Sequence, residues 1–140
     1  MTSSLENLAG PDGPLRREPP DAGEISGLIH SAKVRLADAQ KIENSLESRF
    51  DLAYNAAHAY CLAALRHAGY RSQNRYVVFQ AVPHTLGLGP EVWRVLAKCH
   101  QVRNQGEYEG DLSVDDRLVT DLIKACRSVA GAIRKLPKLS

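Results

Sequence analysis

The sequence has no run of about 18 consecutive apolar residues, the length that a membrane-spanning helix needs. We therefore expect no membrane-spanning segment and no membrane partner. Nor does the amino terminus combine a basic start with an apolar block, which is the pattern of a secretory signal. These absences predict a cytoplasmic protein. With 44% hydrophobic residues in a chain of 140, the sequence is sufficient for one compact domain.

Cysteine is scarce, and Cys61, Cys99 and Cys126 lie far apart with no CxxC pair. This spacing argues against a zinc knuckle or a thioredoxin-type site, and we expect three buried thiols in a reducing compartment. The five histidines are scattered without the spacing of metal ligands, so no metal site is expected. The sequence also lacks the GxGxxG fingerprint, the P-loop, HExxH and a nucleophile elbow, so no cofactor is expected.

A large excess of one charge is also missing, because 18 basic side chains stand against 16 acidic ones. This balance argues against a protein that coats nucleic acid by bulk electrostatics. The charge is nevertheless uneven, since six cations and one carboxylate, Glu91, occur between residues 65 and 105. The distribution allows either a solvated mixed surface or a localised anion-binding face.

The amino-terminal 22 residues contain four prolines and little apolar periodicity. Such a segment buries too little apolar surface to offset its ordering entropy, so residues 1–22 are predicted to form a flexible tail. The folded domain is expected to cover residues 23–137. Asp21 and Glu24 have the spacing of a capping box, which predicts the start of the first helix.

Beyond the tail, apolar residues recur with the helical period, and no alternating pattern of a strand is present. Asn44 with Glu47 and Ser113 with Asp116 are further candidate caps. Helices are predicted from Asp21 to about Ala39, from Asn44 to Gly69, from Asn74 to Val82, from Pro90 to about Gly106, and from Ser113 to Leu136. Pro83 is expected to end the third helix and to begin a loop. These elements predict an all-α fold, a four- to five-helix up-and-down bundle with the alanine-rich second helix at its centre.

A polar stripe at the end of the fourth helix is the main site candidate. His100, Arg103, Asn104, Glu107 and Tyr108 are spaced so that they share one helical face. This face continues the apolar stripe of the same predicted helix, and not the side of the helix that is expected to face solvent. Polar groups in such a position must be paired across a groove or a subunit contact, because leaving them unsatisfied costs several kcal/mol.

Arg103-Asn104 with Tyr108 resembles the R-x4-6-H motif of HEPN domains in its R-N-x-x-x-H form. The tyrosine- and alanine-rich run between Arg49 and Gly69 is similar to the second helix of that family, and the resemblance covers residues 24–136. It implies a helical bundle that forms a homodimer with two motifs in one cleft. Active members are metal-independent RNases, in which the arginine holds the phosphate and the histidine handles the 2′-hydroxyl proton.

Carried over to this chain, the resemblance assigns the phosphate to Arg103 and a positioning role to Asn104, with Tyr108 in place of the histidine. A phenol that titrates near pH 10 is a poor base at neutral pH, which predicts weak or absent catalysis. His100, one turn before Arg103, is a candidate for the missing imidazole. Glu107-Tyr108 also looks like the acidic-tyrosine ending of HEPN proteins encoded beside minimal nucleotidyltransferases, which implies a nucleotidyltransferase partner that modifies Tyr108.

Arg71 and Arg75 are candidate phosphate-binding residues, because Tyr70 and Tyr76 alternate with them and cations with aromatics bind single-stranded RNA. Glu107, together with Tyr108, is expected to complete the cleft around Arg103 and Asn104. Three interpretations stay open: a catalytically weak HEPN-like protein that binds RNA or a nucleotidyltransferase, a toxin-like RNase of a toxin–antitoxin pair, and a purely structural dimeric module.

Overall fold

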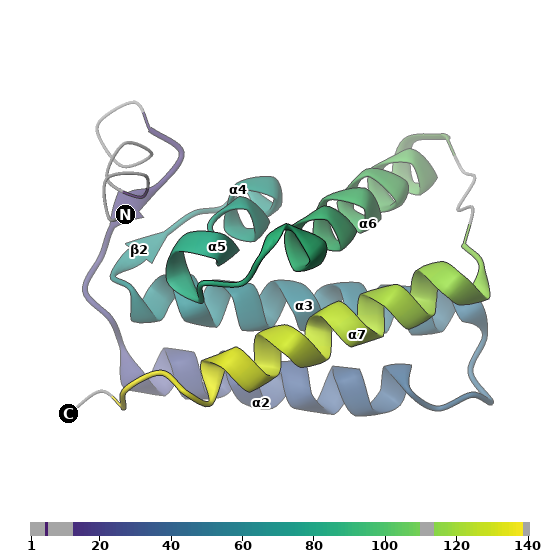
Figure 1. The fold of residues 1–140 in the computed structure, drawn as a ribbon, viewed down its shortest axis with the longest axis horizontal. Coiled ribbons are helices and arrows are strands. Elements are labelled where there is room, and N and C mark those ends of the chain that lie inside the picture. Colours follow the sequence, from purple (N-terminus) through teal and green to yellow (C-terminus); the bar gives the residue numbers. More distant parts are fainter. Residues whose placement is uncertain (1–4, 6–12, 110–113, 139–140) are drawn as a thin grey trace.

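The computed structural model describes residue 5, residues 13–109 without the side chains of 107–109, and residues 114–138. This part of the chain is mostly helical, which confirms the predicted all-α class. Its four long helices alternate in direction along the long axis of the molecule, as in an up-and-down bundle (Figure 1). In chain order the elements are β1 (Arg16–Arg17), α2 (Ala22–Ala39), α3 (Leu46–His67), β2 (Tyr70–Arg71), α4 (Arg75–Gln80), α5 (Val82–Thr85), α6 (Pro90–Glu109) and α7 (Asp116–Ile133).

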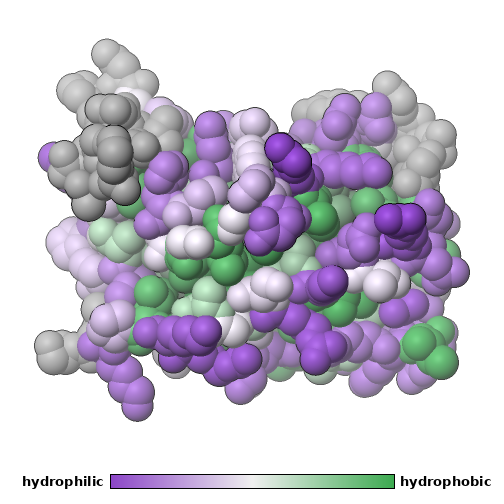
Figure 2. Space-filling view, in the orientation of Figure 1, coloured by the Kyte–Doolittle hydropathy of each residue, from purple (hydrophilic) through white to green (hydrophobic). Residues whose placement is uncertain are grey.

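Helix α3 lies at the centre of the bundle, as its alanine content predicted, and it contacts α2, α4, α5, α6 and α7. All of its alanines are buried, at Ala53, Ala56, Ala57, Ala59, Ala63 and Ala64. Small side chains let neighbouring helices approach closely, so one helix can pack against all the others. On the face drawn in Figure 2, hydrophobic residues gather toward the middle and hydrophilic residues border them.

The three cysteines are buried free thiols, as predicted. Burial raises the pKa of Cys61 well above its ordinary value, and burial raises the pKa of Cys99 and of Cys126 to about 12. The thiolate is the reactive form of cysteine, so these side chains serve as small core residues.

The helix caps match the prediction in one case. Asp21 caps α2, because its Oδ1 accepts a hydrogen bond from a first-turn amide at 2.9 Å. The prediction of Asn44 as the cap of α3 was wrong, since Ser45 accepts from the amide of Ser48 at 3.1 Å. Asn44 instead donates its side-chain amide to the carbonyl of Asp38 at 3.0 Å, which braces the turn between α2 and α3.

Two later boundaries also differ from the prediction. Helix α7 is capped by Asp115, whose Oδ1 accepts from the amide of Leu118 at 2.8 Å, so the assignment to Ser113 was wrong. Ser113 itself lies outside the described residues. Pro83, expected to begin a loop, instead lies in the first turn of α5, where proline needs no amide hydrogen.

Residues 13–22 pack on the bundle, whereas the prediction included them in a flexible tail covering residues 1–22. Strand β1 pairs antiparallel with β2, and Arg16 lies opposite Arg71. Leu15, just before β1, has no exposed surface and belongs to the core. Strands of two residues are too short for an alternating pattern, which is why the sequence pattern predicted none.

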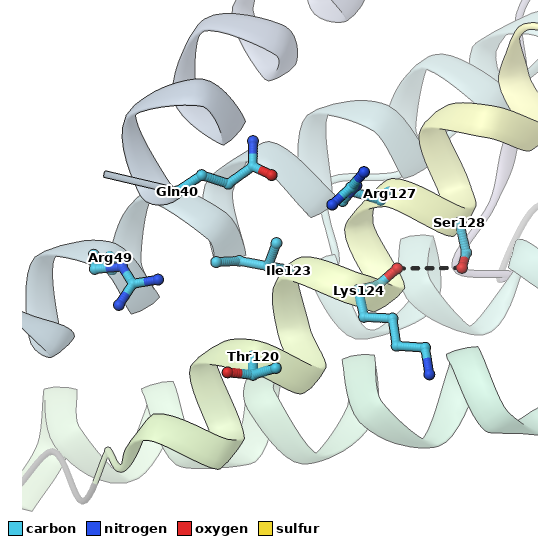
Figure 3. A pocket seen from close by; sticks show the side chains of 7 residues that line it. All are labelled: Gln40, Arg49, Thr120, Ile123, Lys124, Arg127 and Ser128. Carbon is cyan, nitrogen blue, oxygen red and sulfur yellow. Dashed lines mark hydrogen bonds between the residues drawn. The ribbon is translucent and has the colours of Figure 1, made fainter. Parts of the chain in front are cut away.

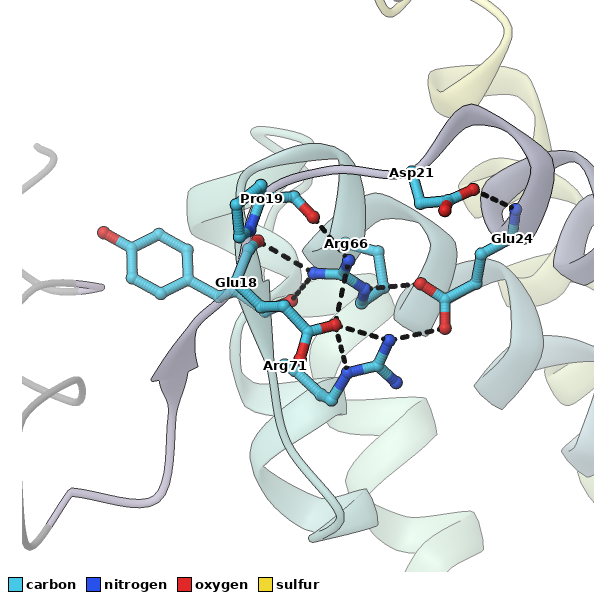
Figure 4. Close-up of polar contacts among 7 residues, drawn as sticks. Glu18, Pro19, Asp21, Glu24, Arg66 and Arg71 are labelled. Atoms are coloured by element: carbon cyan, nitrogen blue, oxygen red, sulfur yellow. Dashed lines mark hydrogen bonds and ion pairs between the residues drawn. The ribbon is translucent and has the colours of Figure 1, made fainter.

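Arg66 of α3 connects this segment to the bundle (Figure 4), and its side chain is only 1% exposed. Its Nε donates to Oε1 of Glu24 at 2.7 Å, and its Nη2 donates to the carbonyl of Pro19 at 2.7 Å. Its Nη1 donates to the carbonyls of Glu18 at 3.0 Å and Tyr70 at 3.2 Å. A buried guanidinium is tolerated when its donors are satisfied in this way.

Arg71, from β2, completes the network by pairing with the carboxylates of Glu18 at 2.8 Å and Glu24 at 2.5 Å. Hydrogen bonds from Arg71 and then Arg66 hold the pKa of Glu24 below its ordinary value, against the raising effect of burial. The guanidinium of Arg71 is thus engaged by two carboxylates. Its predicted role as a phosphate ligand does not agree with this pairing, because the carboxylates neutralise the charge that would attract a phosphate.

Candidate functional site

His100 and Asn104 of α6 form a chain of hydrogen-bond contacts that ends at Tyr54 of α3. His100 Nδ1 lies 2.9 Å from the hydroxyl oxygen of Tyr54, a fully buried residue of α3. His100 Nε2 lies 3.2 Å from the side-chain nitrogen of Asn104, one turn further along α6. His100 is therefore paired across the contact of α6 with α3, whereas the stripe as a whole was predicted to pair across a groove or a subunit contact.

The contacts of His100 fix the position of its proton. The Asn104 amide nitrogen only donates, so His100 Nε2 must accept, and the proton is on Nδ1, which donates to Tyr54. Burial lowers the pKa of His100, and the charges of Arg103 and Arg75 lower it further. His100 is therefore neutral at physiological pH, with the lone pair of Nε2 directed at Asn104.

Two guanidinium groups lie over the ring of Tyr54. The Cζ atom of Arg103, from α6, is 5.0 Å from the ring centroid, and that of Arg75, from α4, is 5.5 Å from it. Arg75 also donates to Oδ1 of Asn55 at 3.1 Å, and no carboxylate within the described ranges pairs with it. We call Tyr54, Arg75, His100, Arg103 and Asn104 the Tyr54 cluster.

Burial, and then the positive charge of the cluster, shift the pKa values of the titratable groups near it. Burial lowers the pKa of His58 to about 4, and Arg75, Arg103 and His100 act in the same direction. Burial raises the pKa of Tyr54, and the two arginines only partly oppose this effect. Both histidines and the phenol are therefore neutral at pH 7, so the positive charge of the site resides on the two guanidiniums. Guanidiniums match the geometry of phosphates and carboxylates, so the site can hold an anion of either kind.

A groove of about 730 Å³ adjoins the cluster along α6. Tyr76 lines this groove and is 41% exposed. The centroid of its ring lies 5.5 Å from that of Trp93 and 5.9 Å from that of His100. Exposed aromatic faces of this kind can stack on nucleic-acid bases. We call this the Trp93 groove; its lining is Tyr76, Trp93, Arg94, Ala97, Lys98, His100, Gln101, Asn104 and Gln105.

The structure brings together four of the predicted site residues, Arg75, His100, Arg103 and Asn104. It assigns Arg71 to the network of Figure 4 instead. The side chains of Glu107 and Tyr108 lie outside the described residues, so their predicted roles stay predictions.

Two residues of α3 were not among those predicted for the site. They are Tyr54, on which the cluster is built, and His58, whose pKa the charges of the cluster lower. Their spacing of four positions places both on one face of α3, and that shared face is the signal that links them to the site. Tyr54 is indeed buried, yet its hydroxyl lies beside His100.

A second basic hollow, of about 530 Å³, lies where α7 faces the junction of α2 and α3 (Figure 3). Arg49, Lys124 and Arg127 line it, and Arg49 donates to the carbonyl of Ala39 at 2.8 Å. In Figure 3 the Lys124 ammonium points away from Arg127. This hollow lacks an aromatic side chain and a histidine in its lining, unlike the Tyr54 cluster.

Comparison with known proteins gives no match to a family model, to a curated protein or to a solved structure. Within residues 13–109 and 114–138, no helix has both the length and the apolar character to cross a membrane. In the same part of the chain, no three histidines, cysteines or carboxylates are grouped as metal ligands would be. The function is therefore inferred from the geometry of the Tyr54 cluster and from the resemblance described above.

Proposed function

We propose that this protein is a HEPN-like helical protein that binds single-stranded RNA through the Tyr54 cluster and the Trp93 groove. The observation that carries the proposal is the convergence of two guanidiniums, from α4 and α6, on one buried tyrosine near the exposed ring of Tyr76 and the half-buried ring of Trp93. Arg75 and Arg103 bind the phosphate, and Asn104 contributes a polar contact next to them.

Single-stranded RNA fits this arrangement better than a duplex does. Guanidiniums match the geometry of phosphate oxygens, while unstacked bases can lie against the rings of Tyr76 and Trp93. A duplex keeps its bases stacked and offers only its backbone and grooves. The overall charge of +2 also favours a local contact over a broad electrostatic surface.

The proposal is tested by titrating a fluorescein-labelled single-stranded RNA with the protein at several salt concentrations and measuring anisotropy. Two phosphate contacts predict a slope of about −1.4 or steeper in the logarithm of the association constant against the logarithm of salt. Negligible binding at every salt concentration would reject RNA binding and favour the interaction module.

The resemblance extends the proposal to the assembly: a cytoplasmic homodimer with two such clusters in one cleft, and a minimal nucleotidyltransferase as a partner in a toxin–antitoxin pair. What supports these points is the similarity of Arg103-Asn104 and of α3 to the HEPN pattern. A protein partner would contact the same cluster through a carboxylate or a bound nucleotide.

A second candidate function, metal-independent RNA cleavage, is favoured by the state of His100. Its neutral imidazole lies one turn from Arg103 and has an acceptor nitrogen at Nε2. In such a reaction the Asn104 amide releases Nε2, which takes the 2′-hydroxyl proton while the 2′-oxygen attacks the adjacent phosphorus. The bond to the 5′-oxygen breaks, this oxygen takes a proton from water, and a 2′,3′-cyclic phosphate remains. Arg103 stabilises the charge on the phosphoryl oxygens.

Incubation with RNA in EDTA tests this candidate. If it is correct, cleavage persists in EDTA, Arg103→Ala abolishes it, and the rate rises with pH until His100 is neutral. Because the pKa of His100 lies below its ordinary value, the rise should be complete at a lower pH than for a free imidazole. Arg117→Ala, at an exposed position of α7, is the matched control. Intact RNA after incubation would eliminate the candidate and leave the binding function.

A further inference from the structure

A further groove, which shares no lining residue with the Tyr54 cluster, lies between α2, α3 and the carboxyl-terminal end of α7. It has a volume of about 500 Å³, which is within the range of small-molecule sites. Its floor is formed by apolar side chains, chiefly Ile25, Ile29, Ala63, Ile133 and Leu136. We call it the Tyr60 groove after the polar residue described next.

Tyr60 of α3 lines this groove beside the apolar side chains of the floor. The residue is only 4% exposed, and its hydroxyl has no hydrogen-bond partner among the described residues, although its oxygen is not itself buried. Arg134 lines the same groove. Burial raises the pKa of Tyr60, while the charge of Arg134 acts in the opposite direction. The Tyr60 side chain is almost buried, while its hydroxyl remains accessible at the groove, has no protein partner and shares the lining with a cation, so it is arranged to donate to an anionic group of a ligand.

The rim of the groove is positively charged. Lys33, Arg134 and Lys138 line it, and no aspartate or glutamate does so in the described part of the chain. His67 Nε2 donates to the carbonyl of Pro137 at 2.6 Å, which holds the segment after α7 against α3. That contact forms one wall of the groove and keeps the cations of the rim near its mouth.

From these features we infer that the Tyr60 groove binds an amphipathic carboxylate of the fatty-acid class. The apolar tail lies on the floor between α2 and α7. The carboxylate accepts hydrogen bonds from the Tyr60 hydroxyl and the Arg134 guanidinium. A neutral apolar ligand leaves the Tyr60 hydroxyl and the Arg134 guanidinium without an acceptor, and an inorganic anion leaves the apolar floor uncovered. The apolar floor and the cationic rim together therefore select an amphipathic anion.

Isothermal titration of the full chain with decanoate, below its micellar concentration, tests this inference. We expect saturable binding of one decanoate per chain. Arg134→Ala should weaken it about tenfold through loss of a charged hydrogen bond, and Tyr60→Phe should weaken it about fivefold. Arg127→Ala removes an exposed cation of α7 that does not line this groove, and it should leave the affinity unchanged.

Three results would overturn the inference: absence of saturable binding, equal affinity for decanol and decanoate, or affinity that Arg134→Ala and Tyr60→Phe leave unchanged.

A second copy of the chain is the alternative occupant of the groove. Light scattering with Ser26→Trp, which blocks the mouth from an exposed position, detects this case. A dimer that this substitution dissociates, together with no decanoate binding, would identify the groove as an interface and refute the ligand site.

Discussion

Replacing Arg66 with methionine lowers the free energy of unfolding by about 3 kcal/mol, the largest effect on stability that we expect from one substitution. Methionine fills much of the volume but supplies no donor. The carbonyls of Pro19 and Tyr70 lose their partners, and the carboxylate of Glu24 loses one of its two arginines. Urea denaturation followed by circular dichroism at neutral pH measures the change.

Two further variants show which property of Arg66 matters. Arg66→Lys keeps the charge but cannot reach several acceptors at once, so it should recover only part of the lost stability. Arg117→Met is the matched control, because the Arg117 side chain is 90% exposed, and it should change stability by less than about 0.5 kcal/mol. Wild-type stability in Arg66→Met would contradict the role assigned to the network.

Removing both guanidiniums of the Tyr54 cluster should weaken RNA binding by about a hundredfold. Each charge-assisted contact with a phosphate contributes roughly 1.5 kcal/mol or more, and the double variant Arg75→Gln with Arg103→Gln loses two of them. The salt dependence should also become shallower by about 1.4, since two fewer counterions are released. Anisotropy titrations of both proteins over a series of salt concentrations provide both quantities.

The matched control removes the same charge elsewhere. Lys124→Gln with Arg127→Gln deletes two cations from the hollow of Figure 3 and leaves the Tyr54 cluster intact. It should keep nearly full affinity. If both double variants lost affinity equally, RNA binding would reflect overall charge, and the assignment to the Tyr54 cluster would fail.

Much of the fold could be predicted from the sequence, because helices leave a local signal. The helical period of apolar residues and the alanines of α3 predicted an all-α bundle with α3 at its centre. The spacing of Asp21 and Glu24 predicted the start of α2. Boundaries were less accurate where neighbouring residues compete for one cap, as with Asn44 and Ser45, since both side chains can accept the same amide.

The contacts between distant residues could not be predicted in the same way. Arg66 bonds to residues 42 to 48 positions earlier, and in the sequence it is one more cation near a helix end. Arg71 and Arg75 have the same local surroundings of aromatic residues, yet one pairs with carboxylates and the other lies over Tyr54. Only the packing of β1, α3 and α4 separates the two roles.

The pKa of His100 measured by NMR, with and without saturating single-stranded RNA, tests the central claim most directly. In the free protein, burial and then the charges of Arg103 and Arg75 hold this pKa below 6.5. A phosphate placed between the guanidiniums offsets their charge, so RNA should raise the pKa of His100, while the uncharged nucleoside adenosine should not. RNA that binds at saturation and leaves the pKa of His100 unchanged would contradict the account, because the phosphate would then lie away from the Tyr54 cluster.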